Sequence, residues 1–450
     1  MTQPHSPEQS VRASLARHVR PGDTLCVGLS GGLDSVALLD ILVGCAAGFD
    51  VALRAMHVNH HLHPGAGEWT AFCRTLCANY GVPLDVADVA VARDSGLGIE
   101  AAAREVRYAA YRTSGARWIV LAHHADDVAE TVLLRILRGA GVKGLAAVPE
   151  TRALSAAQQV LRPLRSATRA ELDAYAVRRG LEWIEDTSNA DERLDRNFIR
   201  RRIMAPLRER FPDAVRGFAR TAGHAAEAQV LLDALGRVDG GVVAGSTAAR
   251  LSVAALRNLS EERARNALRV FLADRGAAMP DAPHLCEAIR QIRAGGASGR
   301  LLIHFDGVDL RRHGDALLLE PPAAAPVRVD VAWRGEVRLA IPQLSGAIEF
   351  HREAGRGIAA ERTAESGWAV RTRAGGEHLR LDKRRPNRTF KNLMQEHRIP
   401  AWQRERLPLL FHGDRLVWIA GVGVDCEYHC ADGAMGVTPV WNPDVAPRRA

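Results

Sequence analysis

The residues best suited to chemistry form the stretch Ser-Gly-Gly-Leu-Asp-Ser at positions 30–35. It follows an apolar run that predicts a buried strand, and it precedes an apolar helix pattern. Two glycines let backbone N–H groups close on an anion, and the positive end of the new helix points there. Ser30 and Ser35 add hydroxyl donors, while Asp34 suits a metal ion or a reacting group. The stretch predicts a phosphate site that is neither a Walker loop nor a dinucleotide fingerprint.

A second polar stretch, residues 123–131, follows a later apolar run. Asp127 and Glu130 are three positions apart near a helix start, so they lie on one helix face. Two carboxylates beside a phosphate chain suit Mg²⁺, which takes oxygen ligands and keeps several waters. The alternative is an acidic first turn that only offsets the helix dipole.

Two more stretches can complete a nucleotide site. Residues 100–108 place Arg104 on a helical stripe, where it suits bidentate contact with a phosphate. The alternative is ion pairing on an exposed helix. The histidine-rich run at 57–63 either binds a metal or forms a loop over the adenine or ribose. We favour the loop because no cysteine or acid completes a ligand set.

Three basic stretches lie further along the chain. Arg138 and Lys143 flank a glycine-rich helix end at 137–144, which is otherwise a plain C-cap. Residues 193–220 contain nine arginines against three acids, a net charge of +6. Residues 367–408 contain eleven basic residues against four acids, a net charge of +7. Such one-sided charge favours contact with nucleic acid phosphates over a solvated surface.

The elements that position these residues alternate along the chain. Strands are expected at 24–29, 51–58, 84–89, 118–121 and 160–164, with helices at 6–18, 35–43, 67–80, 99–115 and 168–180. This alternation predicts a doubly wound parallel α/β sheet that binds ligands at the carboxyl ends of its strands. Residues 214–295 are mostly helical, residues 300–319 suggest a small sheet, and the chain after the proline-rich stretch 321–326 is β-rich. We therefore expect domains at 1–212, 213–322 and 328–445.

Composition narrows the class of protein. The chain has 450 residues, of which 47% are apolar and 25% charged, as in soluble globular proteins. No apolar run can span a bilayer and no secretory signal is apparent, so a cytoplasmic location is expected. Seven scattered cysteines argue against a disulfide framework. A net charge of +8 permits a polyanionic partner.

The motifs resemble a known family. The stretch at 30–35 resembles the PP-loop of the adenylating ATP pyrophosphatases, and residues 123–131 resemble their His-x-x-Asp-Asp-x-x-Glu-Thr signature. Residues 100–108 resemble the Glu-x-x-Ala-Arg-x-x-Arg-Tyr segment of tRNA(Ile)-lysidine synthases. Segments between 375 and 425 resemble the C-terminal domain of the long form of that family.

This resemblance implies a reaction and a set of site residues. The family uses ATP to add L-lysine to the wobble cytidine of tRNA(Ile) with a CAU anticodon, through an adenylated base. The implied catalytic residues are Asp34, Asp127 and Arg104, with Asp34 and Asp127 also as Mg²⁺ ligands. The implied ATP-binding residues are Ser30, Gly31, Gly32, Leu33, Asp34, Ser35, His57 and His123. The implied substrate or tRNA contacts are Arg138, Lys143, Arg196, Arg200, Lys383, Arg384 and Arg385.

Two other functions remain as alternatives. A PP-loop tRNA thiolase usually needs Cys-x-x-Cys pairs or a catalytic cysteine, and this chain has no Cys-x-x-Cys. A non-catalytic RNA-binding protein on a nucleotide fold would not need Asp34 and Asp127. The sequence leaves the general base, the lysine pocket and the oligomeric state open, with a homodimer as one option.

Overall fold

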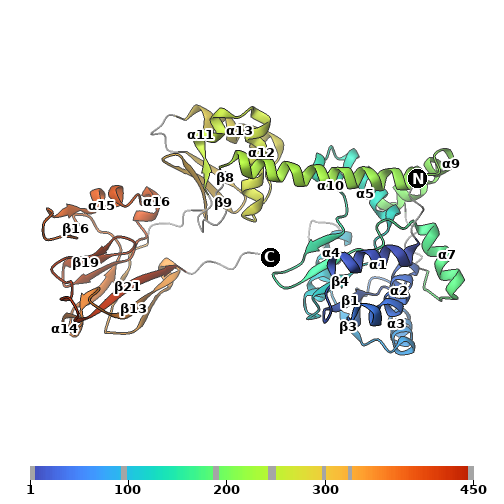
Figure 1. Cartoon of the computed structure of the whole chain (residues 1–450), viewed down its shortest axis with the longest axis horizontal. Coiled ribbons are helices and arrows are strands. Elements are labelled where there is room, and N and C mark those ends of the chain that lie inside the picture. The colour runs from blue at the N-terminus through green and yellow to red at the C-terminus, as the bar shows by residue number, and fades with distance from the viewer. Residues whose placement is uncertain are drawn as a thin grey trace. The chain divides into compact units, whose positions relative to one another are not determined.

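The computed structural model describes residues 6–92, 99–185, 192–241, 250–295, 301–322 and 327–443 (Figure 1). The chain divides into two compact units, one up to Ala234 and the other from Leu235 onward. Our division into three domains stays a prediction, and both residues 323–326 of the expected linker and the expected end at 445 lie outside the described residues. Within the described ranges, no helix is both long and apolar enough to cross a membrane.

The first unit is built on a six-stranded sheet with strand order β3-β2-β1-β4-β6-β5. All neighbouring strands are parallel except β5, which runs antiparallel to β6. The sheet confirms the predicted fold class and the five predicted strands. Strand β5 escapes prediction because its sequence, Thr-Arg-Ala, is short and lacks an apolar run. The strands are β1 Thr24–Gly28, β2 Ala52–Asn59, β3 Leu84–Asp88, β4 Trp118–Val120, β5 Thr151–Ala153 and β6 Gln159–Leu161.

Local signals fix the helices of this unit. Capping boxes at Ser6 and Thr168 begin α1 and α7, and left-handed glycines end α3 and α7. The sequence predicts a helix at 35–43, and α2 is longer because it begins at Leu33 and extends to Phe49. The helices are α1 Pro7–His18, α2 Leu33–Phe49, α3 Ala66–Tyr80, α4 Ile99–Arg112, α5 Ala125–Leu137, α6 Val142–Leu145, α7 Arg169–Arg179, α8 Asp195–Phe198, the π-helix η2 Ile199–Ile203 and α9 Met204–Arg210.

Side chains of β1 alternate between two buried cores. Leu25 and Val27 pack with Leu38 of α2 in one cluster, whereas Cys26 packs with Tyr111 of α4 in another. Successive strand residues point to opposite faces, so helices cover both faces of the sheet. The loops that follow β1, β2 and β4 consequently share one edge, where ligands bind in such folds.

The middle of the chain combines helices with a small sheet. The helices are α10 Ala214–Asp239, α11 Val253–Asn258, α12 Glu261–Asp274 and α13 Ala282–Ala294, and the strands are β7 Leu251–Ser252, β8 Leu302–Phe305, β9 Val308–His313 and β10 Ala316–Glu320. Sheet order is β7-β10-β9-β8. Gly307 and Gly314 have φ of +75° and +60° in the two hairpin turns, as their positions in the sequence suggest. This arrangement confirms the predicted helical middle.

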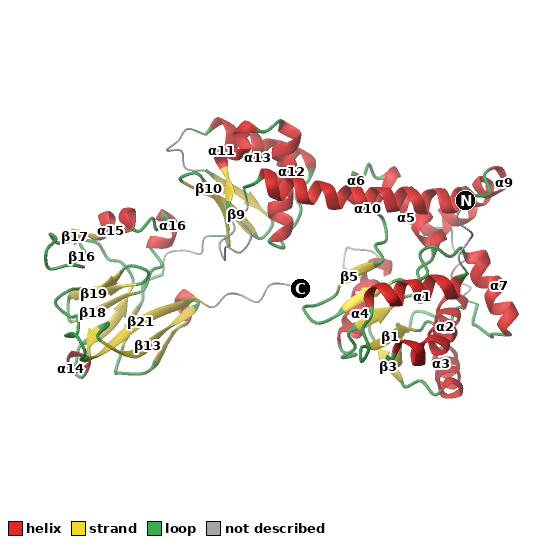
Figure 2. Ribbon diagram, in the orientation of Figure 1, coloured by secondary structure: helices red, strands yellow, loops and turns green. Residues whose placement is uncertain are grey.

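The C-terminal region is β-rich, as predicted (Figure 2). Its five-stranded sheet has the order β11-β15-β18-β19-β20, its four-stranded sheet has the order β12-β13-β21-β14, and β16 pairs with β17. Buried tryptophans at 333, 368 and 418 form much of its core. The strands are β11 Asp330–Ala332, β12 Arg338–Ile341, β13 Gly346–Ala354, β14 Ile358–Ala359, β15 Trp368–Arg371, β16 His378–Leu379, β17 Arg388–Thr389, β18 Leu409–His412, β19 Arg415–Ile419, β20 Gly423–Val424 and β21 Met435–Pro443. The helices are η3 Pro342–Leu344, α14 Ala360–Thr363, α15 Phe390–Glu396 and α16 Ala401–Arg404.

Candidate active site

A cavity of about 520 Å³ lies where β1, β2 and β4 end. It is lined by loops that follow these strands, by the inner face of α4 and by one residue of α8. The predicted site residues that line it are Ser30, Asp34, Ser35, His57, Arg104, His123, Asp127 and Arg196. The two main motifs of the sequence therefore meet in one cavity.

The glycine turn of the PP-loop depends on close packing. Gly31 has φ of +86°, and a Cβ built there would lie 3.0 Å from Ile184 Cδ1. Ser35 Oγ donates to Gly32 O at 2.9 Å and lies 3.1 Å from Ser30 Oγ. Among the residues that the structure describes, no side chain caps the N-terminus of α2, so its first turn keeps the character of an anion site. Leu33 instead packs its side chain into the core.

Asp34 presents one oxygen that no described residue bonds. Its Oδ2 accepts from Arg169 Nη1 at 2.7 Å, and it lies 3.7 Å from His124 Nε2. Its Oδ1 is buried and has no hydrogen-bond partner in the described part of the chain. A buried carboxylate oxygen without a donor is costly unless a ligand or cation completes it.

His124 joins three carboxylates and is a site residue that the sequence did not single out. Its ring nitrogens lie 3.7 Å from Asp34, 3.5 Å from Asp126 and 3.6 Å from Asp127. Burial lowers the pKa of His124, but these carboxylates raise it to about 10. Burial also raises the pKa of Asp127, yet His124 and Arg196 hold it near 2. His124 thus lies in a buried position between Asp34 and Asp127.

Glu130 does not form the carboxylate pair with Asp127 that its spacing suggests. It is fully buried and accepts from Arg196 Nε at 2.8 Å and from Arg200 Nε at 2.6 Å. Asp127 Oδ1 also accepts from Arg196, at 2.7 Å. The two carboxylates that meet at the cavity are therefore those of Asp34 and Asp127, which come from different motifs.

The histidines around the cavity are poor cations. Burial lowers the pKa of His57, whose Nδ1 lies 2.9 Å from Leu29 O. Burial and Arg107 lower the pKa of His60 to about 4. Burial also lowers the pKa of His123 to about 3, with nearby arginines adding to the effect. Neutral imidazoles suit contact with a base or a ribose better than with phosphate.

The remaining histidines of the 57–63 run make local contacts. His61 lies 2.9 Å from Asp88, and His63 stacks on Trp69 with ring centroids 4.7 Å apart. Among the described residues, no group of three or more His, Cys, Asp or Glu side chains could hold a metal ion. His57, His60, His61 and His63 all line the cavity, and their interpretation as a loop over the adenine or ribose stays a prediction.

Several predicted contacts lie outside the cavity lining. Arg138 is exposed and forms an ion pair with Asp195 at 3.2 Å, and Lys143 is exposed in α6. Arg200 donates hydrogen bonds from Nε and Nη2 to the carboxylate of Glu130. The predicted contacts in the second unit, Lys383, Arg384 and Arg385, are exposed in a turn between β16 and β17.

Three family models match successive parts of this chain. A PP-loop domain model matches residues 6–207, a TilS substrate binding domain model matches residues 251–318, and a TilS substrate C-terminal domain model matches residues 369–441. A crystal structure of a TilS C-terminal domain is 17% identical with a TM-score of 0.23, over 26% of this chain and 98% of that one.

Several relatives match over nearly their whole length. The tRNA(Ile)-lysidine synthase of Nitrosomonas europaea is 38% identical over 433 residues, covering 96% of this chain and 94% of that protein. The tRNA(Ile)-lysidine synthase of Aromatoleum aromaticum is 41% identical over 430 residues, covering 95% and 99%. With both motifs at one cavity and such relatives along the full chain, this protein belongs to the tRNA(Ile)-lysidine synthase family.

Proposed function

We propose that this protein ligates L-lysine to C2 of the wobble cytidine of tRNA(Ile) with a CAU anticodon. The cytidine O2 attacks the α-phosphorus of ATP, and pyrophosphate leaves. The ε-amine of lysine, after losing a proton, then attacks C2, and the C2–O bond breaks to release AMP. The observation that carries this proposal is the meeting of Asp34 and Asp127 at one cavity, with His124 between them.

Different polar groups of the cavity would bind different parts of ATP. Backbone N–H groups of the 30–35 loop and the start of α2 would hold phosphates, and Arg104 would balance further phosphate charge. Neutral His123 and His57 would face the uncharged part of the nucleotide. These donors are fixed before the reaction, which is how enzymes stabilise developing charge.

Asp34 and Asp127 fit a Mg²⁺ site better than a proton relay. A Mg²⁺ ion needs only one or two protein carboxylates when substrate phosphates and waters supply the other ligands. The unbonded Oδ1 of Asp34 meets this need. The ion would neutralise charge on the phosphates. Asp127, with a pKa near 2, is a weak base at neutral pH.

The enzyme must also bind tRNA, and we propose that the exposed triplet Lys383–Arg385 contributes. Its position in the β-rich region, away from the PP-loop in the chain, supports a role in capture rather than in chemistry. The homodimer and the cytoplasmic location stay predictions. The thiolase alternative loses support, since the relatives with high coverage are lysidine synthases.

Incubation with tRNA(Ile), ATP and labelled lysine tests the reaction directly. We expect label in the tRNA only when ATP is present. Asp34→Asn, which keeps the side-chain shape, should abolish incorporation while circular dichroism remains unchanged. ATP–pyrophosphate exchange without label transfer would instead point to another adenylating reaction, and neither activity would point to a non-catalytic RNA-binding protein.

A further inference from the structure

Tyr108 lies on the wall of the nucleotide cavity and has an unusual set of neighbours. It belongs to α4, its side chain is buried, and it lines the same cavity as Asp34 and Asp127. Its hydroxyl oxygen accepts from Arg104 Nη2 and from Arg162 Nη2, each at 3.2 Å. A phenol at this place is not explained by packing alone.

Three guanidinium groups surround this one phenol. Arg104 lies 5.0 Å and Arg152 lies 4.5 Å from the centre of the Tyr108 ring. Arg162 is 2% exposed, and its buried Nε has no hydrogen-bond partner in the described part of the chain. Within the described ranges, none of these three arginines forms an ion pair with a carboxylate. Arg162 is the buried member, whereas Arg104 and Arg152 are exposed. A buried positive charge without a carboxylate is costly, so a bound anion near Arg162 would be stabilising.

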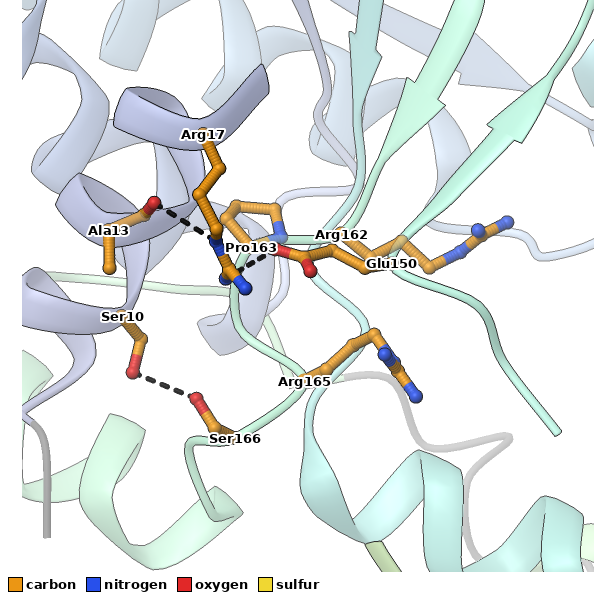
Figure 3. A pocket seen from close by; sticks show the side chains of 8 residues that line it. All are labelled: Ser10, Ala13, Arg17, Glu150, Arg162, Pro163, Arg165 and Ser166. Atoms are coloured by element: carbon orange, nitrogen blue, oxygen red, sulfur yellow. Dashed lines mark hydrogen bonds and ion pairs between the residues drawn. The ribbon is translucent and has the colours of Figure 1, made fainter. Parts of the chain in front are cut away.

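Arg162 holds its place through the backbone. Its Nη1 donates to Pro149 O at 2.8 Å, and its side chain lines a second cavity beside α1 (Figure 3). There Glu150 accepts from Arg17 at 2.9 Å, and Figure 3 shows the Arg162 guanidinium pointing away from this pair. Arg162 therefore faces the hydroxyl of Tyr108 and not an acid.

The hydrogen-bond inventory leaves the Tyr108 hydroxyl proton for a ligand. A hydroxyl has two acceptor lone pairs and one donor hydrogen. Arg104 and Arg162 use the two lone pairs, so the hydrogen must point elsewhere, and Tyr108 borders the cavity. Burial raises the pKa of Tyr108, but the three arginines lower it below its ordinary value. A phenol in this setting is a strengthened hydrogen-bond donor to an anion.

We propose that the Tyr108 hydroxyl completes an oxyanion subsite for a phosphate group of ATP beside Arg104, whose phosphate contact belongs to the proposed function, with Arg162 as a positioning residue. Three guanidinium groups exceed the single charge of a carboxylate such as that of lysine, whereas a polyphosphate matches them. Tyr108 and Arg104 line the same cavity as Ser30 and Ser35 of the PP-loop. The proposal rests on the proposed function only in taking ATP as the nucleotide.

Calorimetric titration of the full chain with ATP, inorganic pyrophosphate and adenosine tests the subsite. Tyr108→Phe keeps the ring and its stacking arginines but removes the donor. We expect it to weaken ATP and pyrophosphate binding about tenfold, as loss of a hydrogen bond to a charged group does, and to leave adenosine unchanged. The matched control is Tyr175→Phe, which removes a phenol hydroxyl bonded to Asp40 outside the cavity, and it should bind all three as the wild type does.

Unchanged pyrophosphate affinity in Tyr108→Phe would overturn the proposal. A loss confined to L-lysine, titrated in parallel, would overturn the assignment to phosphate. If Tyr108→Phe does not fold, Arg104→Gln at an exposed position serves instead, with the same criterion. Because these titrations contain no tRNA, they stand even if the wild type fails to make lysidine.

The positioning role of Arg162 has its own test. Arg162→Lys keeps the charge but loses the fixed geometry of the guanidinium. We expect weaker pyrophosphate binding in the wild-type background and no further weakening in the Tyr108→Phe background, since both changes act through one hydroxyl. Equal losses in both backgrounds would show that Arg162 acts independently of Tyr108.

Discussion

Two arginine-rich segments of this protein look alike in sequence and differ in structure. Residues 193–220 and 367–408 have net charges of +6 and +7, and both suggest a surface for nucleic acid. In the first segment, described arginines form ion pairs with carboxylates that lie elsewhere in the first unit. These pairs are Arg196 and Arg200 with Glu130, Arg208 with Asp126, and Arg216 with Glu171.

The basic triplet of the second segment is arranged in the opposite way. Arg380 Nε donates to Arg385 O at 2.9 Å, and Arg384 N donates to Asp382 Oδ1 at 2.8 Å. These bonds fix the backbone of the turn, while the side chains of Lys383, Arg384 and Arg385 are exposed. Counting charges within a segment therefore fails where the acids that pair with it lie outside that segment.

The largest effect we expect is from Glu130→Gln. This change removes the charge that faces Arg196 and Arg200 in a buried site. Breaking a buried ion pair by removing one partner typically costs about 3–5 kcal/mol, because the other charge stays uncompensated. Urea denaturation should show this loss in the first unit.

The matched control for Glu130 is Glu192→Gln, which faces the exposed Arg202 at 2.9 Å. Exposed pairs contribute at most about 1 kcal/mol. Similar losses for both variants would mean that burial does not separate the arginines of this segment, and our comparison would fail.

Charge reversal of the exposed triplet should act on tRNA and not on the fold. Replacing Lys383, Arg384 and Arg385 by glutamate should flatten the logarithmic salt dependence of tRNA binding by two to three units, at roughly 0.9 per phosphate contact. ATP affinity and the urea midpoint of the first unit should not change. Fluorescence titration of tRNA at several salt concentrations measures the slope.

A charge-preserving variant separates the charge of the triplet from its shape. Arg384→Lys combined with Arg385→Lys should keep the slope, because counterion release depends on charge. An unchanged slope in the glutamate variant would mean that the triplet does not touch tRNA.

The fold was largely predictable because its signals are local. The capping boxes at Ser6 and Thr168, the glycine stops and the apolar runs each act within a few residues. The polar turn at 30–35 and the acidic stretch at 123–131 could be placed at one sheet edge by topology alone. The short edge strand β5 lacked such a signal.

The hydrogen bonds and ion pairs within the site were not predictable from local sequence patterns. Arg169 bonds Asp34 from 135 positions away, and Arg196 bonds Glu130 from 66 positions away. Of two adjacent histidines, His123 lines the cavity, whereas His124 is the N-cap residue of α5 and meets three acids. The only hint in the sequence was that two histidines precede two aspartates at 123–127. This pattern does not predict which of the two imidazole rings becomes charged.

These two histidines should also make the stability of the first unit depend on pH in opposite directions. The pKa of His124 is raised from 6.5 to about 10, so its contribution is complete below pH 6.5 and is lost as pH rises toward 10. The pKa of His123 is lowered to about 3, so its contribution is present above pH 6.5 and is lost as pH falls. Asp34, Asp126 and Asp127 are the carboxylates that face His124.

The urea midpoint of the first unit, measured between pH 4 and pH 9.5, gives a stability profile. Its acid limb reports His123 and its alkaline limb reports His124. We expect a maximum near neutral pH in the wild type. His124→Gln should remove much of the alkaline limb, and His123→Gln should remove part of the acid limb. A flat alkaline limb in the wild type would contradict a charged His124. The triplet variant should follow the wild-type profile, since exposed side chains contribute little.

The smallest effect on tRNA binding is expected from Arg138. It has an acidic partner, like the arginines of 193–220, and it is exposed, like the triplet at 383–385. It lies in the first unit and has an acidic partner, Asp195, yet the side chains are 64% and 74% exposed. If exposure decides whether an arginine is available to RNA, Arg138 belongs with the triplet despite its ion pair. Arg138→Gln should then change the unfolding free energy by less than about 1 kcal/mol, as for other exposed pairs. The salt slope of tRNA binding should fall by about one unit, as expected for one lost phosphate contact. Arg138→Lys, which keeps the charge, should restore the slope. An unchanged slope in Arg138→Gln would show that even a weak, solvent-exposed pair removes an arginine from tRNA contact, and pairing rather than exposure would then separate the two segments.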